Sequence, residues 1–116
     1  MQDRFKFRFW DKETQTMQKI PMVELRHRIT LDKIFVDDRV IFMQCTGLKD
    51  KNGKLIYEGD IVKFKTELFG KPKQIIWDEC HYILKDTFII LCDMEIKQFG
   101  LEVIGNIYEN PELLDT

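Results

Sequence analysis

Two histidines and three cysteines are the residues of this chain most suited to binding a metal or acting as a nucleophile. Cys80 and His81 are adjacent, whereas Cys45 and Cys92 lie far from each other along the chain. Structural zinc sites favour paired ligands on tight turns, such as two cysteines separated by two residues. Neighbouring residues of a strand point to opposite faces, so Cys80 and His81 are poorly placed to share one ion. We therefore expect three free thiols and no metal site.

Catalytic groups are equally hard to find in the sequence. His27 and His81 have no Ser or Cys nucleophile placed near them by a known motif. Two acidic pairs stand in turn-like sequence, Asp37-Asp38 and Asp78-Glu79. Each pair is adjacent rather than opposed, which does not suit general acid–base catalysis. We predict no catalytic residue and no cofactor, and hence a protein that is not an enzyme.

The stretch Asp50-Lys51-Asn52-Gly53 begins like a calcium-binding loop. It lacks the downstream acidic ligands, above all a bidentate Glu, that complete such a site. Asn and Gly both tolerate a positive φ, so the same residues predict a structural hairpin turn with Gly53 at positive φ.

The N-terminal stretch carries the clearest binding pattern, because cationic and aromatic residues alternate. One face of the expected strand holds Arg4, Lys6 and Arg8, and the other holds Phe5, Phe7 and Phe9. We predict that the phenylalanines are buried and the cations solvated. Together with Trp10, the cations would form an interaction face able to contact a nucleic-acid backbone and stack a base. A half-buried strand with a solvated cationic face gives the same pattern.

Composition limits the function classes further. The chain has 116 residues, 44% hydrophobic and 33% charged, which suits one domain, or a small domain with an appendage. Its net charge of −2 argues against broad electrostatic binding to nucleic acid. An odd number of unpaired cysteines fits a reducing compartment. No apolar run approaches the roughly 18 residues that span a bilayer, and no signal peptide stands at the start. We expect a cytoplasmic protein with no membrane partner.

Short apolar runs separated by turns predict a mainly β chain, folded as a small barrel or sandwich. The expected strands cover residues 4–10, 15–20, 55–57, 61–65, 73–77, 81–84, 88–91 and 101–108. Residues 23–31 alternate as a strand but also fit a short helix. Residues 40–43 fit a strand or a helical turn, and residues 93–100 a loop or a short helix. Residues 110–114 predict one helical turn, with Asn110 as its N-cap.

Three blocks of sequence stand in an order that resembles one known family. They are residues 5–12, residues 46–62 and residues 102–114. With these blocks the chain is similar to the YopX family of phage and prophage proteins. The resemblance implies an N-terminal β-rich region over residues 1–45 and a C-terminal SH3-like barrel over residues 46–116. It implies phage or prophage origin, and it brings neither an established activity nor catalytic residues.

Two functions remain open at this stage. The first is a non-enzymatic phage or prophage accessory protein of the bacterial host cytoplasm, which acts through contacts with an unknown protein partner. We expect it to be a homo-oligomer that uses residues 1–20, because a lone hairpin is marginal in water and short sheets leave open edges. The alternative is a small β-barrel that binds nucleic acid, which rests on fold analogy.

Overall fold

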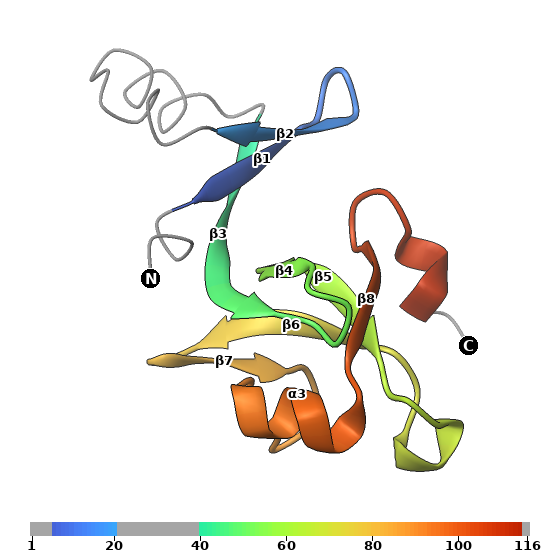
Figure 1. Ribbon diagram of the computed structural model, residues 1–116. Helices are drawn as coiled ribbons and strands as arrows, with labels where there is room; N and C mark the ends of the chain where they lie inside the picture. Colours follow the sequence, from blue (N-terminus) through green and yellow to red (C-terminus); the bar gives the residue numbers. More distant parts are fainter. Residues whose placement is uncertain (1–5, 21–39, 115–116) are drawn as a thin grey trace.

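The protein is mainly β (Figure 1). The computed structural model describes residues 6–20 and 40–114. Its strands are β1 (Phe7–Asp11), β2 (Thr16–Ile20), β3 (Val40–Lys49), β4 (Leu55–Tyr57), β5 (Asp60–Lys63), β6 (Lys73–Asp78), β7 (His81–Leu84) and β8 (Glu102–Asn106). The helical elements are the 3₁₀-helix η2 (Glu67–Phe69), the α-helix α3 (Asp93–Phe99) and the 3₁₀-helix η3 (Pro111–Leu114). The predicted fold class, an N-terminal hairpin followed by a small barrel-like body, is confirmed.

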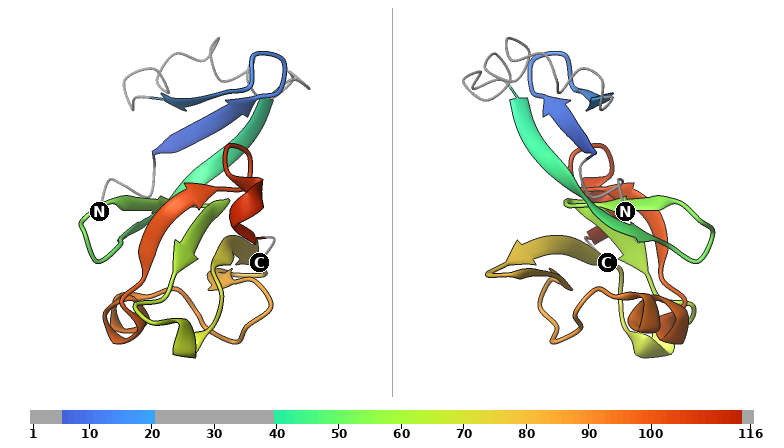
Figure 2. Two further views of the ribbon diagram at one scale, coloured as in Figure 1. Left: turned by 90° about the vertical axis from the view of Figure 1, so that its right-hand side faces the viewer. Right: turned by 60° about the vertical axis from the view of Figure 1, so that its left-hand side comes forward.

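The strands form two antiparallel four-stranded sheets. Their orders are β2-β1-β3-β4 and β7-β6-β5-β8. The hairpin of β1 and β2 lies with the first half of β3 at one end of the molecule, and α3 lies below β7 at the other end (Figures 1 and 2). The second sheet, β4 and the lower half of β3 curl between these ends as the barrel.

Strand β3 belongs to both halves of the molecule. Its first half pairs with β1 and its second half pairs with β4. The register shifts between Cys45 and Lys49, and Gly47 in this interval has a φ of 83°, which glycine adopts without strain. This bulge bends β3, so one continuous strand serves the hairpin and the barrel. The predicted division between residues 45 and 46 falls inside β3.

The hydrophobic core lies in the barrel. Its buried members are Ile56, Val62, Phe64, Ile75, Leu84, Leu91, Ile96, Leu101 and Val103. Helix α3 contributes Ile96 to this cluster, because its short amphipathic face packs against the sheet. Fully burying one such aliphatic side chain contributes about 1.5–3 kcal/mol, so this cluster is the main source of stability.

The turn between β3 and β4 is built around Asp50. Gly53 has a φ of 85°, and its amide donates to the Asp50 carbonyl over 3.0 Å. One Asp50 carboxylate oxygen accepts from the Asn52 and Lys54 amides, and the other accepts from the Val103 amide, each over 2.9 Å. The predicted structural turn is confirmed, and its carboxylate also ties the turn to β8.

The sequence allowed two secondary structures for several segments, and the fold shows which one each segment adopts. Residues 40–43 belong to β3, and residues 93–99 form α3, which ends at Gly100 in the left-handed conformation with a φ of 59°. The strand predicted over residues 88–91 is wrong. Only one bridge, between Ile83 and Ile90, forms there, because the chain turns into α3 immediately afterwards.

The predicted helical turn near the end of the chain is confirmed as η3. The predicted capping role of Asn110 differs, because its side-chain oxygen accepts from the Asn106 amide over 3.2 Å instead. The predicted strand over residues 23–31 lies outside the described residues, as do His27, the Asp37-Asp38 pair, Arg4 and Phe5.

The two faces of β1 are the reverse of the prediction. Arg8 and Trp10 point toward the barrel and are 7% and 9% exposed, whereas Phe7 and Phe9 are only half-buried on the other face. The prediction that Arg8 is solvated is therefore wrong. Alternation separates the two faces of a strand, but the barrel decides which one turns inward, and it offers Asp60 as an ion-pair partner to Arg8.

Candidate functional site

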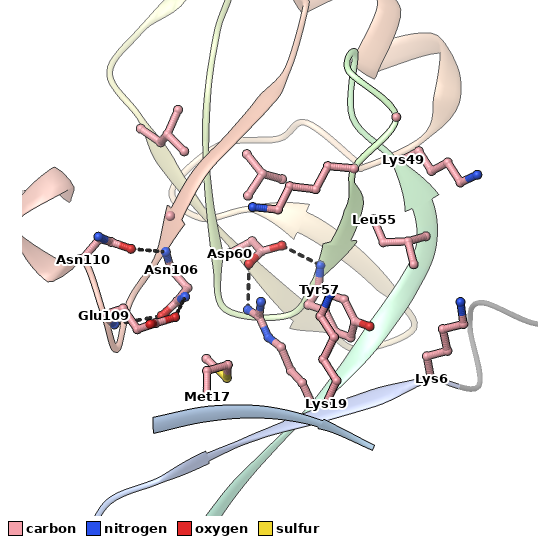
Figure 3. Close-up of a pocket in the computed structure, with 16 residues that line it drawn as sticks. Lys6, Met17, Lys19, Lys49, Leu55, Tyr57, Asp60, Asn106, Glu109 and Asn110 are labelled. Carbon is pink, nitrogen blue, oxygen red and sulfur yellow. Dashed lines mark hydrogen bonds and ion pairs between the residues drawn. The ribbon is translucent and has the colours of Figure 1, made fainter. Parts of the chain in front are cut away.

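A cleft of about 750 Å³ lies between the hairpin and the barrel (Figure 3). Its walls come from β1 and β2 on one side and from β4 and β8 on the other. Five basic and two acidic side chains line it: Lys6, Arg8, Lys19, Lys49, Lys54, Asp60 and Glu109. We call this site the basic cleft. Its excess of positive charge contrasts with the net charge of −2 of the whole chain.

An ion pair between Arg8 and Asp60 forms the floor of the basic cleft. A guanidinium nitrogen of Arg8 lies 2.7 Å from one Asp60 carboxylate oxygen, and their side chains are 8% and 2% exposed. The other Asp60 oxygen accepts from the Tyr57 amide over 2.7 Å. Arg8 also donates to the Glu58 carbonyl over 3.3 Å, and its Cζ lies 4.7 Å from the centre of the Tyr57 ring. These contacts offset the cost of removing two charges from water.

Burial controls the electrostatics of this floor. Burial raises the pKa of the Asp60 carboxyl, and the neighbouring Arg8 guanidinium acts in the opposite direction. Burial also raises the pKa of the Tyr57 hydroxyl. The Nε of Arg8 is buried and has no hydrogen-bond partner within the described part of the chain. The ion pair therefore joins β1 to the start of β5. Its acid and its cation neutralise each other.

The mouth of the basic cleft carries exposed lysines. Lys19, Lys49 and Lys54 are exposed, and no carboxylate of the described residues forms an ion pair with them. The Lys19 ammonium lies 5.9 Å from the centre of the Tyr57 ring. Lys51 and Lys63, by contrast, pair with Glu102 outside this mouth. Three cations therefore surround one opening without an ion pair of their own among the described residues, and the charge of Lys54 acts to lower the pKa of the buried Asp60 carboxyl.

Both walls on the barrel side are edge strands. Among the described residues, β4 pairs only with β3, and β8 pairs only with β5. The one acid at the far end, Glu109, accepts a hydrogen bond from the Asn106 side chain over 2.8 Å. The basic cleft is thus bordered by two edge strands, whose Tyr57, Val103 and Asn106 amides are bonded to side chains, and by three exposed lysines.

The residues predicted as one interaction face do not lie together on an exposed surface of the described fold. Arg4 lies outside the described residues, Lys6 is half-buried at the cleft, and Arg8 belongs to its floor. Trp10 stacks on the Tyr108 ring, with centroids 5.6 Å apart and planes 19° from parallel. The Trp10 ring is therefore buried against Tyr108 and is not exposed for stacking on a base.

Sequence reasoning missed the lysines of the mouth, because no motif joins them. Lys19 ends up opposite Arg8 in the β1–β2 pairing, while Lys49 and Lys54 flank the turn between β3 and β4. Opposed residues of an antiparallel pair share a face, so the inward turn of Arg8 also brings Lys19 to the cleft.

The cysteines do not gather. Cys45 is buried, Cys80 is exposed and Cys92 is intermediate, and none of the three forms a disulfide within the described residues. The Cys80 sulfur lies 4.0 Å from Nδ1 of His81. Within residues 6–20 and 40–114, no group of three His, Cys, Asp or Glu side chains is placed to hold a metal ion. The described helices include none with the length and apolar character needed to cross a membrane.

Known proteins give the following comparisons. A family model described as YopX protein matches residues 6–115. The crystal structure of protein EF1440 from Enterococcus faecalis is similar, with a TM-score of 0.69 and 26% identity, over 94% of this chain and 96% of that one. The crystal structure of protein yopX from Bacillus subtilis has a TM-score of 0.53 and 17% identity, over 96% of this chain and 98% of that one, and shows the shared fold. No curated protein matches.

Proposed function

This chain belongs to the YopX family, and from that premise we propose that it is a non-enzymatic phage or prophage accessory protein. It acts in the cytoplasm of the bacterial host through contacts with other proteins, including copies of itself. The basic cleft is the observation that supports this proposal, because its described lining gathers basic side chains for recognition and includes no Ser, Thr, Cys or His.

Self-association is supported by the outer face of the hairpin. Phe7 and Phe9 lie there half-buried, and Phe7 packs edge-on against Phe42 at 5.7 Å. Strand β2 pairs with β1 alone among the described strands, so none of them covers its other edge. A symmetric contact between two hairpins would cover this apolar face and this edge at once.

Light scattering on the purified full chain tests this proposal. We expect a mass of at least two chains at high micromolar concentration. Phe9→Lys places a charge on the outer face and should reduce that mass to one chain, while Gln98→Lys, on the exposed side of α3, should leave it unchanged. A monomeric full chain, or the same loss in both variants, would reject self-association through the hairpin.

Nucleic-acid binding is the second candidate, and the three exposed lysines of the cleft mouth are the observation that favours it. Fluorescence anisotropy with single-stranded and duplex DNA at low and moderate salt tests it. Binding that weakens steeply with salt and is lost in Lys49→Glu would support this candidate. Binding that is absent at low salt would remove it.

A further inference from the structure

We infer that the basic cleft is the docking site for an acidic, extended segment of a partner protein. This inference rests on the proposed function and gives the partner a chemical class. The first argument is charge: Lys19, Lys49 and Lys54 are exposed around one opening, and no described carboxylate pairs with them. An acidic ligand would supply the missing partners, and complementary charge speeds its approach and selects it over neutral segments.

The floor of the basic cleft also suits a ligand that brings its own negative charge. Asp60 is 2% exposed and already bound to Arg8, so it does not repel an incoming carboxylate as a free acid would. Glu109 is held by the Asn106 side chain at the far end of β8. The lysines therefore dominate the field at the mouth.

The second argument is shape. Strands β4 and β8 border the cleft, and each has one strand neighbour among the described residues. The amides of Tyr57, Val103 and Asn106 already donate to side chains, so a ligand would have only the other main-chain groups of these edges. A strand edge recognises another chain through main-chain hydrogen bonds, which is a recurring mode of peptide binding. An extended segment also points every second side chain to one face, so acidic residues at alternate positions would all face the lysines.

The same site is poorly suited to nucleic acid. Single-stranded binders stack bases on exposed aromatic rings. Tyr57 is 3% exposed beneath the cations of Arg8 and Lys19, and Trp10 is stacked on Tyr108. Three unpaired lysines are also few compared with the roughly 6–10 phosphate contacts typical of proteins that bind duplex DNA. A short acidic segment needs neither rings nor many cations.

Fluorescence anisotropy on the full chain tests the inference. The probe is a labelled peptide of roughly ten residues with glutamate at alternate positions and valine or threonine between them. The comparison probes are the same peptide with lysine in place of glutamate and a single-stranded oligothymidine of similar length. The variants are Lys49→Glu and Lys54→Glu at the mouth, with Lys85→Glu as the matched control, because Lys85 is exposed outside the cleft.

We expect the glutamate peptide to bind and the lysine peptide not to bind. Each mouth variant should raise the dissociation constant about tenfold, which corresponds to about 1.4 kcal/mol, and Lys85→Glu should leave it within about twofold. Thermal melts of the three variants should coincide with that of the parent, because these side chains are exposed.

Three results would overturn the inference. They are no binding of the glutamate peptide at low salt, equal losses in the mouth variants and the control, and lysine-dependent binding of oligothymidine in place of the peptide. Light scattering on the same samples reports separately on the proposed function. An oligomer that ignores the peptide rejects the docking inference alone, and a monomer that binds it through Lys54 rejects self-association alone.

Discussion

Replacing Arg8 by leucine should be among the most destabilising single changes in the hairpin. The substitution keeps an apolar stem against Tyr57 but removes the cation 2.7 Å from the Asp60 carboxylate. Asp60 is 2% exposed, so water cannot replace the lost partner. Breaking a buried ion pair by removing one member typically costs about 3–5 kcal/mol. In a domain of this size that loss lowers the melting temperature on the order of 10–20 °C.

The structure lets this magnitude be divided by a double-mutant cycle. Arg8→Leu removes the ion pair, the hydrogen bond to the Glu58 carbonyl and the contact with the Tyr57 ring. Asp60→Asn keeps an acceptor for the Tyr57 amide but leaves the guanidinium buried without a counter-charge. The double variant buries no charge, so its loss should be clearly smaller than the sum of the two single losses.

Urea denaturation followed by circular dichroism measures all three variants. Lys12→Leu is the matched control, because it removes a cation from an exposed position in the β1–β2 turn and should change stability by less than about 0.5 kcal/mol. If Arg8→Leu stays within about 1 kcal/mol of the parent, or the two single losses add, the ion pair does not clamp the hairpin to the barrel.

Three further predictions concern the core and the turns. Gly53→Ala should cost about 1–2 kcal/mol from its φ of 85° alone, and Gly100→Ala should cost more, because its new methyl would lie 2.6 Å from the Lys65 Cβ; urea denaturation giving the opposite order would contradict this. Trp10→Ala should cost about 3–5 kcal/mol by the same assay, and a loss below about 1 kcal/mol would show that its burial against the barrel is misjudged. Burial raises the pKa of Tyr82 from 10.0 to about 12, so the fold holds that proton longer than the unfolded chain does, and stability should fall as the pH rises from 10.0 through about 12. Tyr82→Phe should lessen this fall, and tyrosinate absorbance that titrates identically in folded and urea-unfolded protein would refute the shift.

Local features of the fold were predictable because short-range rules determine them. The turn at Asn52-Gly53 needs a positive φ, and Gly53 adopts it at 85°. The hairpin of residues 15–20 with β1 follows from alternation across a polar turn. The sequence did not decide between a loop and a helix at α3, because its seven residues carry too short a periodic pattern.

The orientation of β1 could not be predicted from the sequence. Alternation placed Arg8 and the phenylalanines on opposite faces, as they are, but hydrophobicity alone turned the phenylalanines inward. The barrel reverses this choice, since Asp60 is buried and needs a cation, and Tyr108 offers a ring to Trp10. Both partners lie roughly fifty to a hundred residues further along the chain, beyond the reach of any local pattern.

The basic cleft was unpredictable for the same reason. The three exposed lysines of its mouth come from β2, from the end of β3 and from the turn before β4, and each one alone looks like an ordinary solvated residue. Only the pairing of Arg8 with Lys19 and the bulge in β3 bring them around one opening. Alternation therefore led to the right strand, but Arg8 and Trp10 lie on the face that turns toward the barrel and not on a solvated one.

The long separation between Arg8 and its partners has a consequence for synthesis on the ribosome. The hairpin leaves the exit tunnel first, but its contact at Glu58 lies 50 residues later in the chain. At about 5–20 residues per second, the hairpin waits roughly 3–10 seconds for the barrel strand that completes it. During that interval Arg8 and Trp10, which face the barrel in the finished fold, lack their partners Asp60 and Tyr108, and this is when neighbouring nascent copies on one messenger RNA would meet.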